Sequence, residues 1–333
     1  MNRSKTLGAG LALLSVLSFA FHTSDHGAQD DPALGRLDPH GRVGIYLTSY
    51  ALTKSGVWEG LIAAREAGTI DTVVINVKNM HGEVTYNSDV PLARAIGAVT
   101  GRLDLHALLP DLHARGFYLI ARQVLFYDPL LAQYLGKGGE WVPVDDATAV
   151  EYNLAIAEEV ASLGFDELQF DYIRYPDGGE LLPVYEDRYA AVDRFLAQVS
   201  DRLRGQIILS ADLFGRVLWR WNERRIDPIG QSLEEMCHHL DFLSPMLYPS
   251  HYVERAYQDD PYRVVRDALD AGNTRVRANF RPFLQAFDRA IPAGMSLEEY
   301  IREQIRAAVE SGADGYLFWH PASEYSALYR ALR

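Results

Sequence analysis

The chain has 333 residues, of which 48% are hydrophobic, so it can bury the core of one large α/β barrel or of two ordinary domains. Its 45 Asp and Glu against 32 Lys and Arg give a formal net charge of −13. A surface that binds nucleic acid phosphates needs an excess of basic residues, and no basic cluster offsets this balance, so no nucleic acid partner is expected.

The first residues have the pattern of a secretory signal peptide. Two basic residues precede an apolar run over residues 7–21, which contains the small-residue cleavage pattern Ser18-Phe19-Ala20. This run is shorter than the ~20 residues of a membrane-spanning helix, and no later stretch could span a membrane. The expected organisation is a signal peptide at 1–20, a polar disordered leader at 21–41 and a folded domain at 42–333. We therefore expect an exported protein, periplasmic or extracellular, with no integral membrane span after signal removal.

After residue 42 one pattern repeats, in which a helix ends in a glycine-containing turn and a short apolar strand follows. It occurs in AAREAGTIDTVVINVK, DLHARGFYLIARQV, EEVASLGFDELQFD, DALDAGNTRVRANF and AVESGADGYLFWH. The glycines suit left-handed helix C-caps, and the apolar runs are typical of parallel strands buried on both faces. Three more strand candidates, Val43–Leu47, Ile207–Ala211 and Phe242–Met246, bring the number to eight.

Eight strands that alternate with helices predict one domain of the α/β class, a (β/α)8 TIM barrel. A doubly wound open sheet is the alternative, but it would carry a glycine-rich phosphate loop after its first strand, where YLTSYAL stands instead. Two of the helices have capping-box signatures at their starts, Ser232 with Glu235 and Ser296 with Glu299.

Two carboxylates are expected to face each other at the mouth of this barrel. Because side chains alternate between the faces of a strand, Asp171 on the fourth strand and Asp212 on the fifth point inward, at the end where TIM barrels carry their active sites. A carboxylate pair is the minimum for cleaving a glycosidic bond, since one donates a proton and the other attacks or activates water. A structural role in ion pairs, for instance of Asp171 with Arg174, is the alternative.

Other strand ends carry aromatic, basic and histidine side chains that could bind a sugar. On the second strand, the same alternation points Asn76 and Lys78 inward. Tyr and Trp can stack on the apolar face of a sugar ring and reach its hydroxyls. Because no HxxxH or HxH spacing accompanies the histidines, no metal and no cofactor is expected. The predicted substrate-binding residues are Tyr46, Lys78, Arg122, Tyr172, Arg174, Tyr248, His251, Arg281, Trp319 and His320.

Several of these segments together resemble a known family. GIYLTSYAL, ARQVLFYDP, GFDELQFDYIRYP, SADLFG, SPMLYPSHY and GYLFWHP are similar to a bacterial family of domains of unknown function described as putative glycoside hydrolases, barrels distantly similar to the α-amylase superfamily. The resemblance runs from about Val43 to His320 and implies a (β/α)8 fold and a carbohydrate substrate. By analogy with α-amylases, it implies that Asp171 is the nucleophile and Asp212 the acid/base. The second strand departs from the family pattern, with Asn76 and Asn79 where acidic residues are usual.

Family-18 chitinases also lead into an acidic fourth strand, with the motif DxxDxDxE. The same register here ends in Ile173 at the position of the catalytic Glu, so substrate-assisted chitinase chemistry is not expected. The sequence thus predicts an exported glycoside hydrolase acting on a polysaccharide or glycan. Two other functions stay open: a non-catalytic carbohydrate-binding barrel and a metal-dependent polysaccharide deacetylase.

Overall fold

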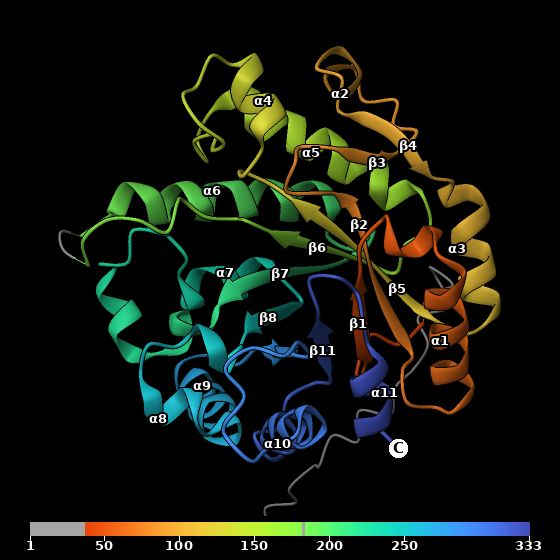
Figure 1. The fold of residues 1–333 in the computed structure, drawn as a ribbon. Helices are drawn as coiled ribbons and strands as arrows, with labels where there is room; N and C mark the ends of the chain where they lie inside the picture. The colour runs from red at the N-terminus through yellow and green to blue at the C-terminus, as the bar shows by residue number, and fades with distance from the viewer. Residues whose placement is uncertain (1–36, 182–183) are drawn as a thin grey trace, which may run out of the picture.

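The structure is a computed structural model that describes residues 37–181 and 184–333. Within these residues, eight parallel strands close into a barrel, because the last of them pairs with the first (Figure 1). In barrel order they are β1 (Val43–Leu47), β2 (Thr72–Lys78), β5 (Tyr118–Val124), β6 (Glu167–Asp171), β7 (Ile208–Phe214), β8 (Phe242–Met246), β10 (Phe283–Gln285) and β11 (Tyr316–Trp319). The predicted single-domain (β/α)8 TIM barrel is confirmed.

The predicted signal peptide, 1–20, and most of the predicted leader lie outside the described residues. The end of the leader contacts the barrel, where the Gly41 N–H donates to Asp314 Oδ1 at 2.7 Å. No helix in the described part of the chain is long and apolar enough to cross a membrane.

Helices surround the barrel and cover the outer face of its strands (Figure 1). The main ones are α1 (Ser55–Glu66), α3 (Leu105–Ala114), α5 (Ala147–Ser162), α6 (Glu186–Leu203), α7 (Leu233–His239), α9 (Pro261–Arg275), α10 (Leu297–Glu310) and α11 (Ser326–Ala331). Two short helices, α4 (Pro129–Tyr134) and α8 (Arg255–Gln258), lie in loops. The predicted capping box of Ser296 and Glu299 starts α10. At α7 only half of it forms, because Ser232 caps the helix while the Glu235 carboxylate pairs with Arg225.

Four of the five predicted glycine caps are confirmed. Gly68, Gly116, Gly164 and Gly312 have φ of 70°, 81°, 103° and 70° and end their helices in the left-handed region. The prediction is wrong for Gly272, which lies inside α9. There a Cβ atom would come within 3.1 Å of Leu218 and Phe280, so glycine allows the helix to approach its neighbours closely.

The structure departs from the simple repeat at two places. An insertion follows β2 and consists of β3 (Val84–Tyr86), α2 (Pro91–Ala95) and β4 (Val99–Leu103). Strand β3 pairs antiparallel with β2 and parallel with β4. The seventh barrel strand runs farther along the chain than predicted, and it is interrupted. Its first part, β9 (Asn279–Phe280), pairs with β8, and its second part, β10, follows after a break. Pro282 stands in this interruption, and its lack of an N–H prevents a continuous ladder.

The predicted alternation of strand side chains is confirmed for the apolar residues. Val73 and Ile75 of β2, and Leu168 and Phe170 of β6, lie in the large core between strands and helices. Inside the barrel is a smaller cluster rich in aromatic residues. Its buried members are Tyr46, Val74, Tyr118, Ile120, Tyr248, Phe283 and Leu317.

Arg281, predicted to bind substrate, instead lies in the barrel interior, away from the mouth. Arg281 is fully buried, and its Nη1 and Nη2 donate to Glu167 Oε2 at 3.0 Å. Glu167 stands at the start of β6 and also accepts hydrogen bonds from Tyr118 and Ser210. The substrate-binding prediction for Arg281 is therefore wrong, because its guanidinium binds Glu167 at the start of β6, whereas Asp171 is the last residue of that strand.

Replacing Arg281 with methionine would leave the buried Glu167 carboxylate without its cation. We expect Arg281→Met to lower the free energy of unfolding by about 3–5 kcal/mol, measured by denaturant titration. The control is Arg115→Met, which breaks an exposed pair with Asp111 (3.2 Å) and should cost less than about 1 kcal/mol. Equal losses in the two variants would contradict the structural role of Arg281.

Candidate active site

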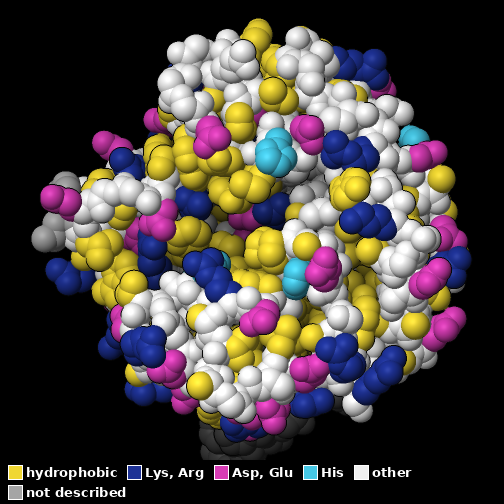
Figure 2. Space-filling model, in the orientation of Figure 1, with side chains coloured by type: hydrophobic (Ala, Val, Ile, Leu, Met, Phe, Trp, Pro, Cys, Tyr) yellow, Lys and Arg dark blue, Asp and Glu magenta, His cyan; other side chains and the backbone are white. Residues whose placement is uncertain are grey.

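A cavity of about 1290 Å³ opens at the carboxyl ends of the barrel strands. Figure 2 shows this face as a hollow with hydrophobic side chains around it and acidic and basic side chains within. Both predicted carboxylates, Asp171 and Asp212, line it. Six of the ten predicted substrate-binding residues line it as well: Arg122, Tyr172, Arg174, Tyr248, His251 and Trp319.

Asp171 is the last residue of β6, and Arg122 of β5 binds it. The Arg122 Nε donates to Asp171 Oδ2 at 3.1 Å, and its Nη2 donates to the same oxygen. The Tyr172 backbone N–H donates to Asp171 Oδ1 at 2.6 Å. Arg122 also donates to Asn76 Oδ1 at 2.6 Å, so this amide helps to orient the guanidinium. These bonds fix the Asp171 carboxylate at the mouth.

Asp212 lies close to this pair but in a different environment. Its Oδ2 is 3.7 Å from the Arg122 Nε, its side chain is almost fully buried, and its Oδ1 has no hydrogen-bond partner in the described part of the protein. Burial and, next, the negative charge of Asp171 raise the pKa of Asp212 well above its ordinary value. Asp212 is thus suited to carry a proton, while Asp171 is held by a cation.

The backbone turns sharply directly after Asp171. Tyr172 has φ of 53°, a left-handed conformation that is uncommon for a residue with a side chain. This turn points the Tyr172 N–H back at Asp171 and places its ring against Tyr127 and Trp141, with ring centroids 5.2 and 5.8 Å apart. Strain of this kind is found where the position of a functional group matters.

Aromatic rings form the opposite side of the pocket. Trp319 of β11 contacts Tyr248, with ring centroids 5.9 Å apart, and stacks on Tyr46 at 6.2 Å. Tyr248 also meets His251 edge to face. Tyr46 itself is buried beside Trp319, and its hydroxyl accepts a hydrogen bond from Asn76, so it supports the site rather than lining the cavity. Such rings can stack on the apolar face of a sugar.

Lys78 does not reach the pocket, so its substrate-binding prediction is wrong. The β2–β5 register shifts between Asn76 and Lys78, and this irregularity turns the Lys78 side chain out of the barrel. Its Nζ is fully buried, lies 2.7 Å from Asp128 Oδ2 and donates to Asn153 of α5. Lys78 is therefore part of the core.

Two further predicted residues have other surroundings than expected. His320 is half-buried outside the pocket lining, and its Nδ1 accepts the backbone N–H groups of Ala322 and Glu324. Arg174 lines the pocket but makes no ion pair with Asp171, contrary to the alternative considered from the sequence. Arg122 takes that place.

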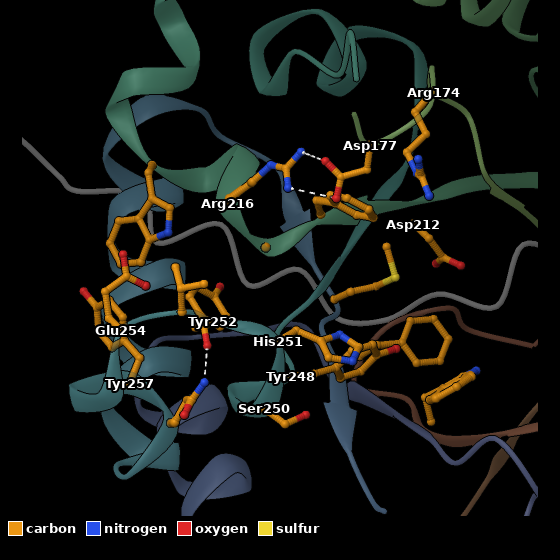
Figure 3. Close-up of a pocket in the computed structure, with 18 of the residues that line it drawn as sticks. Arg174, Asp177, Asp212, Arg216, Tyr248, Ser250, His251, Tyr252, Glu254 and Tyr257 are labelled. Atoms are coloured by element: carbon orange, nitrogen blue, oxygen red, sulfur yellow. Dashed lines mark hydrogen bonds and ion pairs between the residues drawn. The ribbon is translucent and has the colours of Figure 1, made fainter. Parts of the chain in front are cut away.

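Part of the pocket comes from loops that the sequence analysis left unassigned. Figure 3 shows Asp177 hydrogen-bonded to the adjacent Arg216, with Tyr252, Glu254 and Tyr257 in another part of the pocket lining. Trp219 also lines the cavity and stacks on Tyr257 with ring centroids 5.8 Å apart. The sequence signal was present in the aromatic run Trp219-Arg220-Trp221, which follows the fifth predicted strand in the position of an active-site loop.

The described residues hold no group of three or more His, Cys, Asp or Glu side chains arranged to bind a metal ion. What the pocket offers is a carboxylate bound by a guanidinium, a second carboxyl group with a raised pKa, and aromatic walls. This combination can perform acid-assisted hydrolysis of a glycosidic bond.

The fold is a TIM barrel, and a comparison with protein families gives the class of the protein. Residues 44–325 match the family described as "Putative glycosyl hydrolase domain", and the chain belongs to this family. The protein is thus a glycoside hydrolase, and its substrate is a carbohydrate. No curated protein matches the chain.

Solved structures share the fold at low sequence identity. The PgaB (BpsB) glycoside hydrolase domain from Bordetella bronchiseptica has a TM-score of 0.66 and 14% identity, covering 88% of this chain and 98% of that one. A chitinase from Rhizomucor miehei has a TM-score of 0.55 and 12% identity over 87% and 98% of the two chains. The endo-1,4-β-D-mannanase from Thermotoga petrophila has a TM-score of 0.55 and 13% identity over 84% and 88%. These likenesses concern the fold alone.

The raised pKa of Asp212 leads to a stability prediction. Folding favours the protonated form of Asp212, so the wild type loses stability as pH rises through the folded pKa of this residue. The asparagine side chain in Asp212→Asn cannot ionise. We therefore expect the free energy of unfolding of this variant to increase relative to that of the wild type as pH rises, by about 1.4 kcal/mol for each unit by which the folded-state pKa is raised. Denaturant titrations across pH measure this difference, with the exposed Asp111→Asn as control. A difference that does not change with pH would contradict the prediction.

Proposed function

We propose that the protein hydrolyses glycosidic bonds within a polysaccharide or glycan and that Asp171 and Asp212 are the catalytic pair. The observation that carries the proposal is the asymmetry of two neighbouring carboxyl groups in one pocket. Asp171 accepts hydrogen bonds from Arg122, whereas the pKa of Asp212 is raised by burial and by the Asp171 charge. Groups whose environments differ in this way are suited to the acid and the nucleophile or base of a glycosidase.

In the proposed reaction, Asp212 donates its proton to the glycosidic oxygen as the bond to the anomeric carbon breaks. Asp171, which neighbours Asp212 on the adjacent strand, attacks the anomeric carbon with its carboxylate or removes a proton from the attacking water. Water supplies the hydroxyl of the new reducing end and returns the proton to the pair. Arg122 fixes Asp171, and the rings of Tyr248 and Trp319 provide a surface on which the sugar can stack.

A non-catalytic sugar-binding barrel would use the same aromatic wall, but it has no need of a buried carboxyl group with a raised pKa. The metal-dependent deacetylase has no supporting ligand cluster among the described residues. Ile173, buried in the core, bears no carboxyl group with which to act as the chitinase acid. Hydrolysis by the two aspartates is therefore the function that the pocket favours.

Asp171→Asn should fold normally and lose at least ~10³-fold in rate on a polysaccharide that the wild type cleaves, because the amide cannot act as nucleophile or base. Release of reducing ends measures the rate. The matched control is Asp166→Asn. Asp166 directly precedes β6, whereas Asp171 ends it, and the Asp166 carboxylate accepts a hydrogen bond from the backbone N–H of Leu119. The control variant should retain turnover after correction for folded protein. Unchanged turnover of Asp171→Asn would overturn the assignment.

We propose further that the protein is exported, on the evidence of the N-terminal sequence pattern. Expression of the full chain in a bacterial host should yield mature protein outside the cytoplasm with Phe21 as its first residue. Terminal sequencing checks this. Replacing Ala20 with a bulky residue should retain the precursor, and a cytoplasmic, uncleaved wild-type chain would contradict the proposal.

A further inference from the structure

Arg174 is a buried cation without an acidic partner. It is 8% exposed, and it forms no ion pair with any carboxylate in residues 37–181 or 184–333. Its one hydrogen bond runs from Nη1 to the backbone oxygen of Tyr175 at 3.0 Å. A guanidinium has five N–H donors, and a buried charge is costly unless it is paired, so this side chain is incompletely satisfied by the protein itself.

Aromatic rings enclose the Arg174 guanidinium on several sides. Its central carbon lies 4.5 Å from the ring centre of Phe214, 4.7 Å from that of Trp141 and 5.0 Å from that of Tyr172. Ring faces stabilise a cation but accept none of its conventional hydrogen bonds, so they hold the group in place and leave its donors available. Figure 3 shows the Arg174 side chain extending into the pocket.

The contrast with Arg216 supports this interpretation. Arg216 lines the same cavity, but its guanidinium is neutralised by Asp177 at 2.6 Å and by Asp227 at 2.8 Å. Burial lowers the pKa of Arg174, and the negative charge of Asp171 acts in the opposite direction. A second cation, the exposed Arg289, also lines the cavity.

We propose that Arg174 binds an anionic substituent of the sugar chain, a carboxylate or a sulfate ester, and that the protein therefore acts on an acidic glycan. This inference rests on the proposed function and names its substrate class. Two oxygens of such a group match the fork of the guanidinium, which favours Arg over Lys at this position. Because Arg174 lines the same cavity as Asp171 and Asp212, the anionic group would lie on a sugar unit close to the bond that is cleaved.

The first test compares glycans that differ only in charge. Affinity electrophoresis of the wild type, at physiological ionic strength, uses polygalacturonate against its carboxyl-reduced form and dextran sulfate against dextran. We expect stronger retardation by the charged member of at least one pair, and the pair that responds distinguishes a carboxylate from a sulfate. No difference within either pair overturns the inference.

The second test assigns the difference to Arg174. Arg174→Gln should weaken binding of the charged glycan at least about tenfold and leave the neutral one unchanged, and Arg174→Lys, which keeps the charge without the fork, should fall between. The control is Arg188→Gln, which also removes a guanidinium stacked over two tyrosines but lies outside the pocket lining. Equal loss in Arg174→Gln and Arg188→Gln overturns the inference, and Arg174→Lys provides the measurement if Arg174→Gln does not fold.

Binding and hydrolysis separate the two proposals. One outcome is charge-dependent binding through Arg174 without release of reducing ends from any glycan. It would contradict the proposed hydrolysis and support the anion site. Hydrolysis confined to neutral glycans would contradict the anion site and leave the carboxylate pair standing.

Discussion

The site depends on the guanidinium of Arg122. It hydrogen-bonds Asp171 of β6, lies 3.7 Å from Asp212 of β7 and is oriented by Asn76 of β2, so it links side chains from three strands around the barrel mouth. Burying two carboxyl groups side by side is costly without a cation. Arg122 does not bind the two carboxyl groups equally. Asp171 accepts its hydrogen bonds, while the pKa of Asp212 is raised by burial and by the charge of Asp171.

This asymmetry, rather than the barrel, argues for the proposed chemistry. TIM barrels support many reactions, and the similarity to a chitinase and a mannanase at 12% and 13% identity concerns the strands and helices. Membership of the glycosyl hydrolase family gives the class of substrate. The pocket adds a detail of its own, because Arg174 is enclosed by aromatic rings and left without a carboxylate, an environment suited to an acidic sugar chain.

The sequence predicted those features that follow from local periodicity. Eight strands, their order and the inward phase of Asp171 and Asp212 came from the alternation of apolar residues and from glycine-terminated helices. Lys78 was misplaced because a register irregularity before it reverses the side-chain direction, and no sequence period encodes such a shift. The alternative of an ion pair between Asp171 and Arg174 is wrong in its partner, because Arg122, distant in sequence, binds Asp171. Contacts between strands decide such details, and local sequence does not contain them.

The proposed acid role requires that Asp212 carries a proton at a pH where an ordinary aspartate is ionised. Carbon-13 NMR of labelled aspartate carboxyl groups, with Asp212→Asn to assign the signal, measures its titration directly. We predict that the Asp212 carboxyl group stays protonated well above the ordinary aspartate pKa of about 3.9, and that its titration shifts to lower pH in Asp171→Asn, where the neighbouring charge is gone. An Asp212 that titrates like an exposed aspartate, with no response to Asp171→Asn, would contradict it.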